Sequence, residues 1–169
     1  PALTMRLLSE ENRMGTIELL LTKPISNWQV LMAKFSASLI LIIIALLLTS
    51  PYIKTVSSLG NLDLGQVFSG YLALILFSGM MIGIGIFTSS IGSNQIVSYL
   101  LALFIGIFFQ IIFQMLGQNF VGFTGHILDY LSTFSHFESM TRGVIDSRDV
   151  LFFVGISFLS LVFSEIMLI

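Results

Sequence analysis

The most constraining feature of this sequence is a run of 65 residues, from position 64 to position 128, that contains no formally charged side chain. A transmembrane helix needs about 20 apolar residues, so this run is too long for one crossing of a bilayer and suits two. Its polar interruption is the stretch SSIGSNQ at residues 89–95. We therefore expect two spanning helices, at residues 67–88 and 96–116, joined by a tight polar turn.

The composition indicates an integral membrane protein. Of the 169 residues, 56% are hydrophobic and 9% are charged, whereas an ordinary soluble domain has about 25% charged residues. The net charge is -2 and the basic residues form no stripe, which argues against a nucleic-acid partner. The absence of cysteine excludes disulfides and thiolate metal sites. We expect an all-α, polytopic bundle of transmembrane helices in a lipid bilayer.

Two further spans are expected on either side of the uncharged run. Residues 35–53 carry no charge and have a lysine at each edge, and Pro51 lies where it can end or kink the helix. Residues 54–66 contain several turn-forming residues and are expected to be a short loop. The last span is expected at residues 150–169. The chain thus forms a single transmembrane domain with four spans.

Residues 4–34 precede the first span and combine charge with a helical pattern. Leucine, methionine and isoleucine side chains recur on one side of a helix and charged ones on another, which makes it amphipathic. The apolar side consists of Leu7, Met14, Ile17 and Leu21, and the charged side of Arg6, Glu10 and Arg13. With three carboxylates (Glu10, Glu11 and Glu18) against two arginines, the segment suits a protein partner better than an anionic lipid surface.

Three signals divide this amino-terminal stretch into shorter pieces. Gly15 weakens the first helix in its middle, and Pro24 ends it. Ser26 and Gln29 form a capping box, which predicts that a new helix begins at Asn27.

Small and polar residues within the spans predict helix contacts. Gly79 and Gly83 lie four residues apart with Gly85 following, a spacing that lets another helix approach closely. The alternative for these glycines is a pore lining or a hinge. Gln110 and Gln114 lie one turn apart, and amides within a bilayer must face protein or water. We expect them to bond to a neighbouring helix or to line a polar path.

Residues 117–148 mix glycines, histidines and charges with many aromatic side chains. This composition is typical of re-entrant or interfacial helices at a membrane surface, here expected at residues 127–134 and 138–145 on the outward side.

Four residues of this region are of metal-binding types, which leaves open a metal site or a membrane enzyme: His126, Asp129, His136 and Glu138. Their spacing matches no compact ligand pattern, so we predict no metal and no catalytic residue. No ATPase or hydrolase motif occurs in the sequence.

The basic residues favour one orientation weakly. Arg6, Arg13, Lys23 and Lys34 precede the first span, and Lys54, Arg142 and Arg148 lie on the other side, so the amino-terminal stretch is expected inside. The chain begins without methionine and stops within an apolar run, and we expect both ends to be cuts through a longer protein.

Several strings together resemble one family. The stretch MRLLSEENRMGTIELLLTKPISNWQVLMAKF resembles the cytoplasmic segment of ABC-2-type transporter permeases, with a charged helix, then GTxELLLTxP, then a tryptophan and a lysine. The strings GNLDLG, IGIFTSS and NQIV are similar to the same family. YLS, HFES and RGVIDSRD resemble its gliding-motility subgroup. The resemblance covers essentially the whole chain.

The resemblance implies a permease of six spans, of which the four spans here are the third to the sixth. Residues 4–34 would then be a coupling segment docked on a separate ABC ATP-binding subunit. That subunit would bind ATP and Mg²⁺, and this chain would hold no cofactor. The coupling residues would be Glu10, Arg13, Met14, Gly15, Thr16, Ile17, Glu18 and Leu21.

The resemblance also implies a second permease, identical or different, in the bacterial inner membrane, and export as the function, with gliding motility as one process it could serve. The alternative is a membrane anchor or scaffold that transports nothing and belongs to a motility or secretion machine energised by a partner ATPase. An exporting permease and a scaffold without transport would have the same folded architecture.

Overall fold

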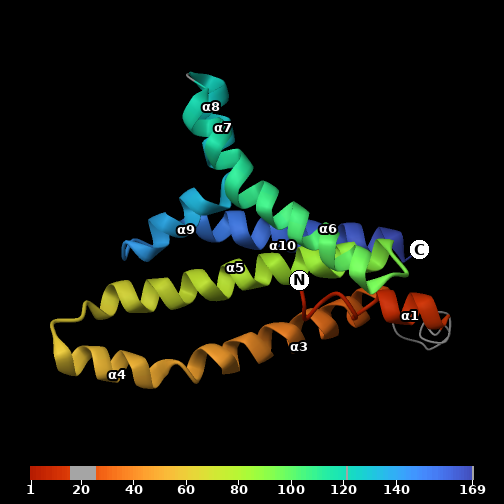
Figure 1. Ribbon diagram of the computed structural model, residues 1–169, viewed down its shortest axis with the longest axis horizontal. Coiled ribbons are helices and arrows are strands. Elements are labelled where there is room, and N and C mark those ends of the chain that lie inside the picture. The colour runs from red at the N-terminus through yellow and green to blue at the C-terminus, as the bar shows by residue number, and fades with distance from the viewer. Residues whose placement is uncertain (16–25, 121, 169) are drawn as a thin grey trace.

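The computed structural model describes residues 1–15, 26–120 and 122–168, and all regular secondary structure in these ranges is helical. Four helical stretches are long and apolar enough to cross a membrane: Asn27–Leu59, Leu64–Ile91, Gln95–Asn119 and Ser147–Met167. The third of these packs on the second at one end and leads away from the bundle at the other (Figure 1). The prediction of an all-α, polytopic membrane protein is confirmed.

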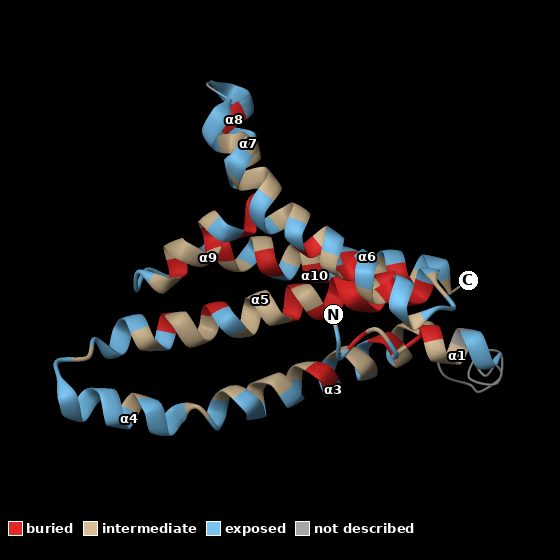
Figure 2. Cartoon of the chain, in the orientation of Figure 1, coloured by how far each residue is buried: buried red, intermediate tan, exposed pale blue. Residues whose placement is uncertain are grey.

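Helix α5 (Leu64–Ile91) is the centre of the bundle. Buried residues gather on its second half and on α10 (Ser147–Met167), which packs along it (Figure 2). One hydrophobic cluster joins Ala73, Met80 and Ile84 of α5 to Met140 and Phe153. A second cluster lies nearer the carboxyl end of α5. Every other long helix is therefore positioned by its contact with α5.

Helix α3 (Asn27–Leu47) begins where the capping box predicts. The hydroxyl of Ser26 accepts a hydrogen bond from the backbone N–H of Gln29, and the Gln29 side chain accepts one from the N–H of Ser26, both at 3.3 Å. These bonds satisfy two backbone donors that a helix start leaves without partners. The predicted start at Asn27 is confirmed.

The prediction of a loop at residues 54–66 is wrong. After a break at residues 48–49 the chain continues as helix α4 (Ser50–Leu59), and α5 begins at Leu64. Pro51 lies in the first turn of α4, where a missing N–H is tolerated, although it leaves the Leu47 carbonyl without its helical partner. The proline therefore interrupts the helix without ending it, and the loop shrinks to residues 60–63.

The first helical stretch is longer than a bilayer requires. The stretch Asn27–Leu59, which contains α3, the break and α4, has 33 residues, which is about 50 Å at 1.5 Å per residue, against a hydrocarbon layer of about 30 Å. Helix α4 has no buried residue. When α3 spans the hydrocarbon, α4 and the start of α5 extend beyond it as a hairpin.

The polar turn expected at residues 89–95 is shorter than predicted. Helix α5 continues to Ile91, and Asn94 begins α6 (Gln95–Ile107) by accepting a hydrogen bond from the N–H of Ile96 at 3.0 Å. Ser89 is consequently part of a helix rather than of a turn. Its hydroxyl is thereby held at a fixed place on the surface of α5.

The third long stretch contains a π-helical turn. Helix α6 continues through η1 (Phe108–Ile112) into α7 (Phe113–Asn119). Helix α6 packs on α5, and α7 leads obliquely away from the bundle (Figure 1). π-helical turns insert an extra residue in the hydrogen-bond ladder and are frequent at functional sites.

Two glycines fold the chain back after α7. A Cβ at Gly117 would lie 2.9 Å from the backbone nitrogen of Asp129, and a Cβ at Gly125 would lie 1.9 Å from the carbonyl oxygen of Phe120. Helix α8 (Phe123–Tyr130) therefore packs directly on α7, and we call this pair the arm. Side chains larger than hydrogen at either glycine would separate the two helices.

After the arm, α9 (Thr133–Thr141) returns to α5 and α10. Two short helices are thus present in this region, as predicted, but they begin at residues 123 and 133 instead of 127 and 138. The chain turns earlier than expected because Gly122, at φ 93, adopts a backbone conformation that favours glycine.

Candidate functional site

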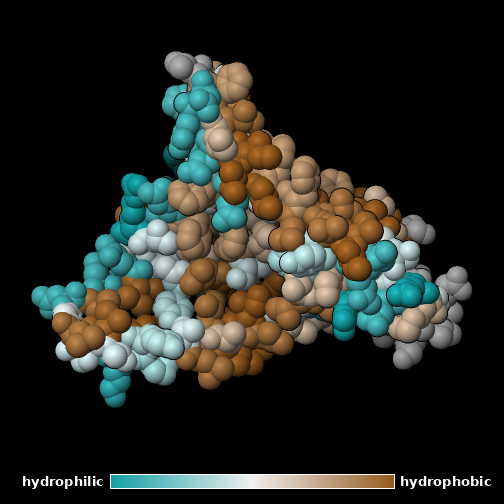
Figure 3. Space-filling model, viewed as in Figure 1, coloured by the Kyte–Doolittle hydropathy of each residue, from teal (hydrophilic) through white to brown (hydrophobic). Residues whose placement is uncertain are grey.

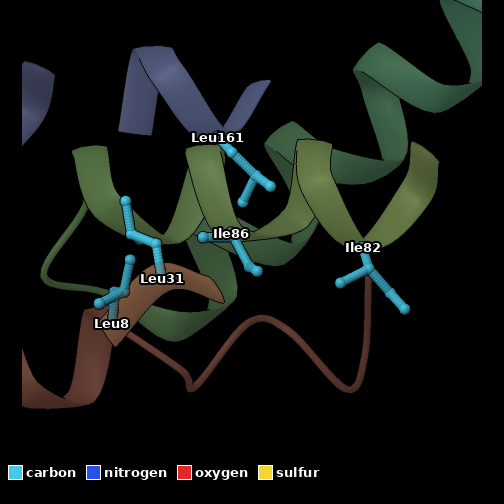
Figure 4. Close-up of a cluster of buried hydrophobic side chains, with 5 residues drawn as sticks. All are labelled: Leu8, Leu31, Ile82, Ile86 and Leu161. Carbon is cyan, nitrogen blue, oxygen red and sulfur yellow. The ribbon is translucent and has the colours of Figure 1, made fainter. Parts of the chain in front are cut away.

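The amino-terminal segment, residues 1–15, lies against the bundle at the carboxyl end of α5 (Figure 1). Its Leu8 is 1% exposed and belongs to a cluster whose other members come from three long helices (Figure 4). These are Leu31 of α3, Ile82 and Ile86 of α5, and Leu161 of α10. The segment is therefore a packed part of the fold, and its position depends on three helices together.

Ser89 is the polar anchor of this segment. Its hydroxyl oxygen accepts hydrogen bonds from the backbone N–H groups of Leu8, at 3.0 Å, and Ser9, at 2.9 Å. The same hydroxyl donates to the carbonyl oxygen of Met5 at 3.3 Å. One side chain of α5 thus satisfies three backbone groups just before and at the start of α1 (Ser9–Met14). Buried backbone groups of this kind are costly to leave without partners.

Gly85, one turn before Ser89, makes the close approach of the segment possible. A Cβ at Gly85 would lie 1.9 Å from the Oγ1 atom of Thr4 and 2.7 Å from its Cβ. Thr4 is itself 1% exposed, so it has little freedom to move away. The absence of a side chain at Gly85 is what lets the segment reach the Ser89 hydroxyl.

Lys34 joins the same segment to α3. Its ammonium group lies 2.6 Å from the Glu11 carboxylate, and it also donates a hydrogen bond to the carbonyl oxygen of Leu7. The two charged side chains are only 17% and 25% exposed, so solvent screens the pair less than it screens a surface ion pair. Together with Ser89, Lys34 fixes the segment to both α3 and α5.

Helix α1 is shorter than the predicted amphipathic helix. It spans Ser9–Met14 and ends at Gly15, whose φ of 67 is left-handed, so the glycine ends the helix instead of weakening its middle. Arg13, Met14 and Gly15 are exposed, and Glu10 is half-buried. Four other predicted coupling residues lie outside the described residues: Thr16, Ile17, Glu18 and Leu21.

The three α5 glycines predicted to form packing contacts, Gly79, Gly83 and Gly85, do not all face the same neighbour. A Cβ at Gly83 would lie 3.1 Å from the carbonyl oxygen of Ser157 in α10, whereas one at Gly79 would make ordinary contacts with Phe35 and Leu39 of α3. Gly85 faces the amino-terminal segment. The stretch therefore contacts three partners rather than a single helix.

In the part of the chain that the structure describes, the two glutamines of the third span form no hydrogen bond to another helix. Gln110 lies in the π-helical turn and is exposed, and Gln114 is half-buried beside a polar cleft between α7 and α9. Within the described residues, neither amide has a hydrogen-bond partner. The predicted bonds to a neighbouring helix are therefore not formed among the described residues of this chain, and Gln114 lines a polar cleft.

The four possible metal-binding residues do not converge, and no metal-binding group occurs among the described residues. His126 is exposed, Asp129 accepts a hydrogen bond from Ser135 at 2.8 Å, and Glu138 pairs with Arg142 at 2.6 Å. His126 and Asp129 belong to α8, and Glu138 belongs to α9. The one buried member of the set is His136.

His136 pairs with Asp149, which the sequence reasoning missed. Nδ1 of the histidine lies 2.7 Å from a carboxylate oxygen of Asp149, and Nε2 lies 2.8 Å from the carbonyl oxygen of Tyr130. Because a carbonyl oxygen only accepts, Nε2 donates to Tyr130, and Nδ1 shares its hydrogen bond with the carboxylate. Both imidazole nitrogens therefore have partners within the protein.

The surroundings of this pair bury it at the junction of α9 and α10. Both side chains are 7% exposed, and the imidazole stacks on Phe152 with ring centroids 4.1 Å apart. The second carboxylate oxygen of Asp149 has no hydrogen-bond partner in the described part of the chain. The stability of this buried carboxylate therefore depends on its contact with His136.

Comparison with protein families identifies one match. The family model described as ABC-2 family transporter protein matches residues 2–168, which include the amino-terminal segment, the long helices and the arm. No curated protein and no solved structure matches the sequence significantly.

Replacing Gly85 by alanine is expected to loosen the amino-terminal segment, because the added methyl group would collide with Thr4. Overpacking costs about 1–3 kcal/mol, so alkylation of a cysteine placed at the buried Ser9 should become about tenfold faster. Gly70→Ala is the matched control on the same helix, since nothing lies within 4 Å of a Cβ there. Equal labelling rates in the two variants would contradict this account of Gly85.

Replacing His136 by alanine is expected to destabilise the protein by roughly 3 kcal/mol, because it leaves a buried carboxylate unpaired. The exposed His126→Ala should change stability by less than about 0.5 kcal/mol. Asp149→Asn should cost less than His136→Ala, since its amide can donate to Nδ1. Unfolding in detergent measures all three, and equal stability of the two histidine variants would rule out a structural role for the pair.

Proposed function

Because this chain belongs to the ABC-2 family of transporter proteins, we propose that it is the permease subunit that couples ATP hydrolysis by a separate subunit to export. Members of this family are membrane components of ABC transporters that work with an ABC ATPase subunit, and the catalysis lies in that subunit. The four long apolar helices agree with a multi-pass membrane protein.

The attachment of the amino-terminal segment is the observation that carries the proposal. Ser89 ties the segment to α5, Lys34 ties it to α3, and Leu8 packs against Leu161 of α10. A force on this segment would reach three long helices at once. Allosteric transmission of this kind requires packed, rigid elements that move together.

The exposed residues of α1 are the proposed contact with the ATPase. Arg13 and Met14 face away from the bundle, and Met14 is 62% exposed. An exposed cation beside an exposed apolar side chain suits a protein surface that offers a carboxylate and an apolar pocket. Binding of ATP and Mg²⁺ is assigned to the ATPase subunit.

Orientation and assembly belong to the same proposal. With the amino-terminal segment in the cytoplasm of a bacterial cell, α4, α9 and the arm lie toward the outer side of the inner membrane. A second permease, identical or different, would complete the transport pathway. Gliding motility is one process that such export could serve, and a scaffold without transport would need the same ATPase contact but would move no substrate.

Arg13→Glu and Met14→Asp are each expected to weaken the ATPase contact, because each places a carboxylate in the proposed interface. Loss of one central contact commonly costs more than about 1 kcal/mol, so co-purification of the ATPase from detergent should fall about tenfold. Arg148→Glu, an exposed arginine at the other end of the bundle, is the control. Undiminished co-purification with both α1 variants would exclude this surface.

The Ser89→Ala variant should separate binding of the ATPase to α1 from transmission of its movement to α5. The variant keeps the exposed face of α1, so the ATPase should still co-purify, but three backbone groups lose their partner on α5. Stimulation of ATP hydrolysis by the permease should fall several-fold, about 1 kcal/mol in coupling free energy. Ser69→Ala is the control, because the Ser69 hydroxyl donates to Gln66 within its own helix. Full stimulation in Ser89→Ala would contradict the proposed route.

A further inference from the structure

A polar cleft of about 510 Å³ lies between the arm and α9. Its main lining residues are Gln114 and Gln118 of α7, Asp129 of α8, and Ser135, Glu138 and Arg142 of α9 and its carboxyl end. Figure 3 shows hydrophilic residues along the side of the arm that faces α9, and hydrophobic ones along the opposite side. The cleft is therefore a concentration of polar groups in a protein of which 56% is hydrophobic.

The position of Asp129 is built into the arm. The backbone at Asp129 rests on Gly117 of α7, where a Cβ would come within 2.9 Å, and this contact brings the carboxylate beside the glutamines. Ser135 donates to one carboxylate oxygen at 2.8 Å. The carboxylate has no cationic partner among the described residues and remains able to accept further hydrogen bonds.

The cleft has one wall formed by the arm and another formed by α9 and its carboxyl end. Arg142 supplies a positive charge on the α9 wall, opposite in sign to Asp129 on the arm. Its Nη2 atom lies 2.6 Å from a Glu138 oxygen, four residues earlier in the chain. One carboxylate occupies one part of the guanidinium, which has five N–H donors in all. The side chain is 72% exposed, so its remaining donors are accessible to an anion that enters the cleft.

The two walls together present hydrogen-bond donors for an anion and hydrogen-bond acceptors for a cation in one cleft. Arginine is suited to phosphate because its planar donors match two phosphate oxygens. Asp129 and the glutamine amides can accept hydrogen bonds from a primary ammonium group, whereas a trimethylammonium group has no N–H to donate. The ligand chemistry that satisfies both walls is a phosphate and a primary ammonium on the same small group.

We propose that this cleft binds a phosphoethanolamine group, with the phosphate on Arg142 and the ammonium on Asp129. A membrane lipid is the source that the surroundings favour. Val144, which lines the cleft, is 63% exposed, and α8, which supplies Asp129, also carries the exposed Phe123 at 80% and Tyr130 at 54%. Among these, tyrosine is a residue type enriched at the level of lipid headgroups. The proposal goes beyond export and does not depend on the ATPase contact.

The test measures lipid retention by native mass spectrometry on the full chain, purified with equal amounts of phosphatidylethanolamine, phosphatidylcholine and phosphatidylglycerol. The wild type should retain phosphatidylethanolamine about tenfold over phosphatidylcholine, as expected for one charge-assisted hydrogen-bonded contact. Asp129→Asn should abolish this preference, and Arg142→Gln should lower retention of all three lipids. Matched controls are Asp63→Asn and Arg148→Gln, both exposed and outside the cleft.

Soluble glycerophosphoethanolamine distinguishes a membrane lipid from a free, soluble compound as the source of the phosphoethanolamine group. Displacement of the lipid by this compound at similar concentration would show that the cleft recognises the free group and overturn the assignment to a lipid, and resistance to displacement would support a membrane lipid. Equal retention of phosphatidylethanolamine and phosphatidylcholine by the wild type would overturn the proposal. An undiminished preference in a folded Asp129→Asn protein, verified by its melting temperature, would overturn it as well.

Discussion

The close approach of α10 and the amino-terminal segment to α5 is the constraint on which the rest of this structure depends. Lipid tails are as apolar as leucine side chains, so spanning helices gain little hydrophobic free energy when they exchange lipid for one another. Their association must come from tight packing, which small residues allow. At Gly83 the backbone of Ser157 lies close enough to exclude a side chain without adjustment, and at Gly85 the buried Thr4 occupies that space. One stretch of α5 thereby positions both α10 and the amino-terminal segment.

Polar contacts between distant parts of the chain hold the two ends of the bundle. Ser89 satisfies backbone groups of the amino-terminal segment, and His136 pairs with Asp149 where α9 meets α10. Such groups are expensive to bury alone, so each contact favours one arrangement over alternatives that would leave a partner unsatisfied. By contrast, α4 has no buried residue and the arm stands away from the bundle, which leaves both free to meet lipid or another subunit (Figure 2).

Several features could be predicted because their causes are local. The length of an apolar run predicts a spanning helix, and the capping box at Ser26 predicts the start of α3. The loop expected at residues 54–66 was wrong because a proline can end one helix or begin the next, and the residues after it decide between the two. The histidine and carboxylate set left a metal site open for a different reason. Residue types suggested ligands, but the directions of α8 and α9 decide that His126 and His136 never meet.

The sequence by itself determined that this is an all-α membrane protein with four long helices, because hydropathy, charge scarcity and capping act over a few residues or one helix length. Only the tertiary structure decided that Ser89 holds Leu8 and Ser9 and that His136 pairs with Asp149. The reason is physical. Ser89 and Ser9 are 80 positions apart, and their contact depends on which helix faces meet after packing, which no local spacing rule encodes.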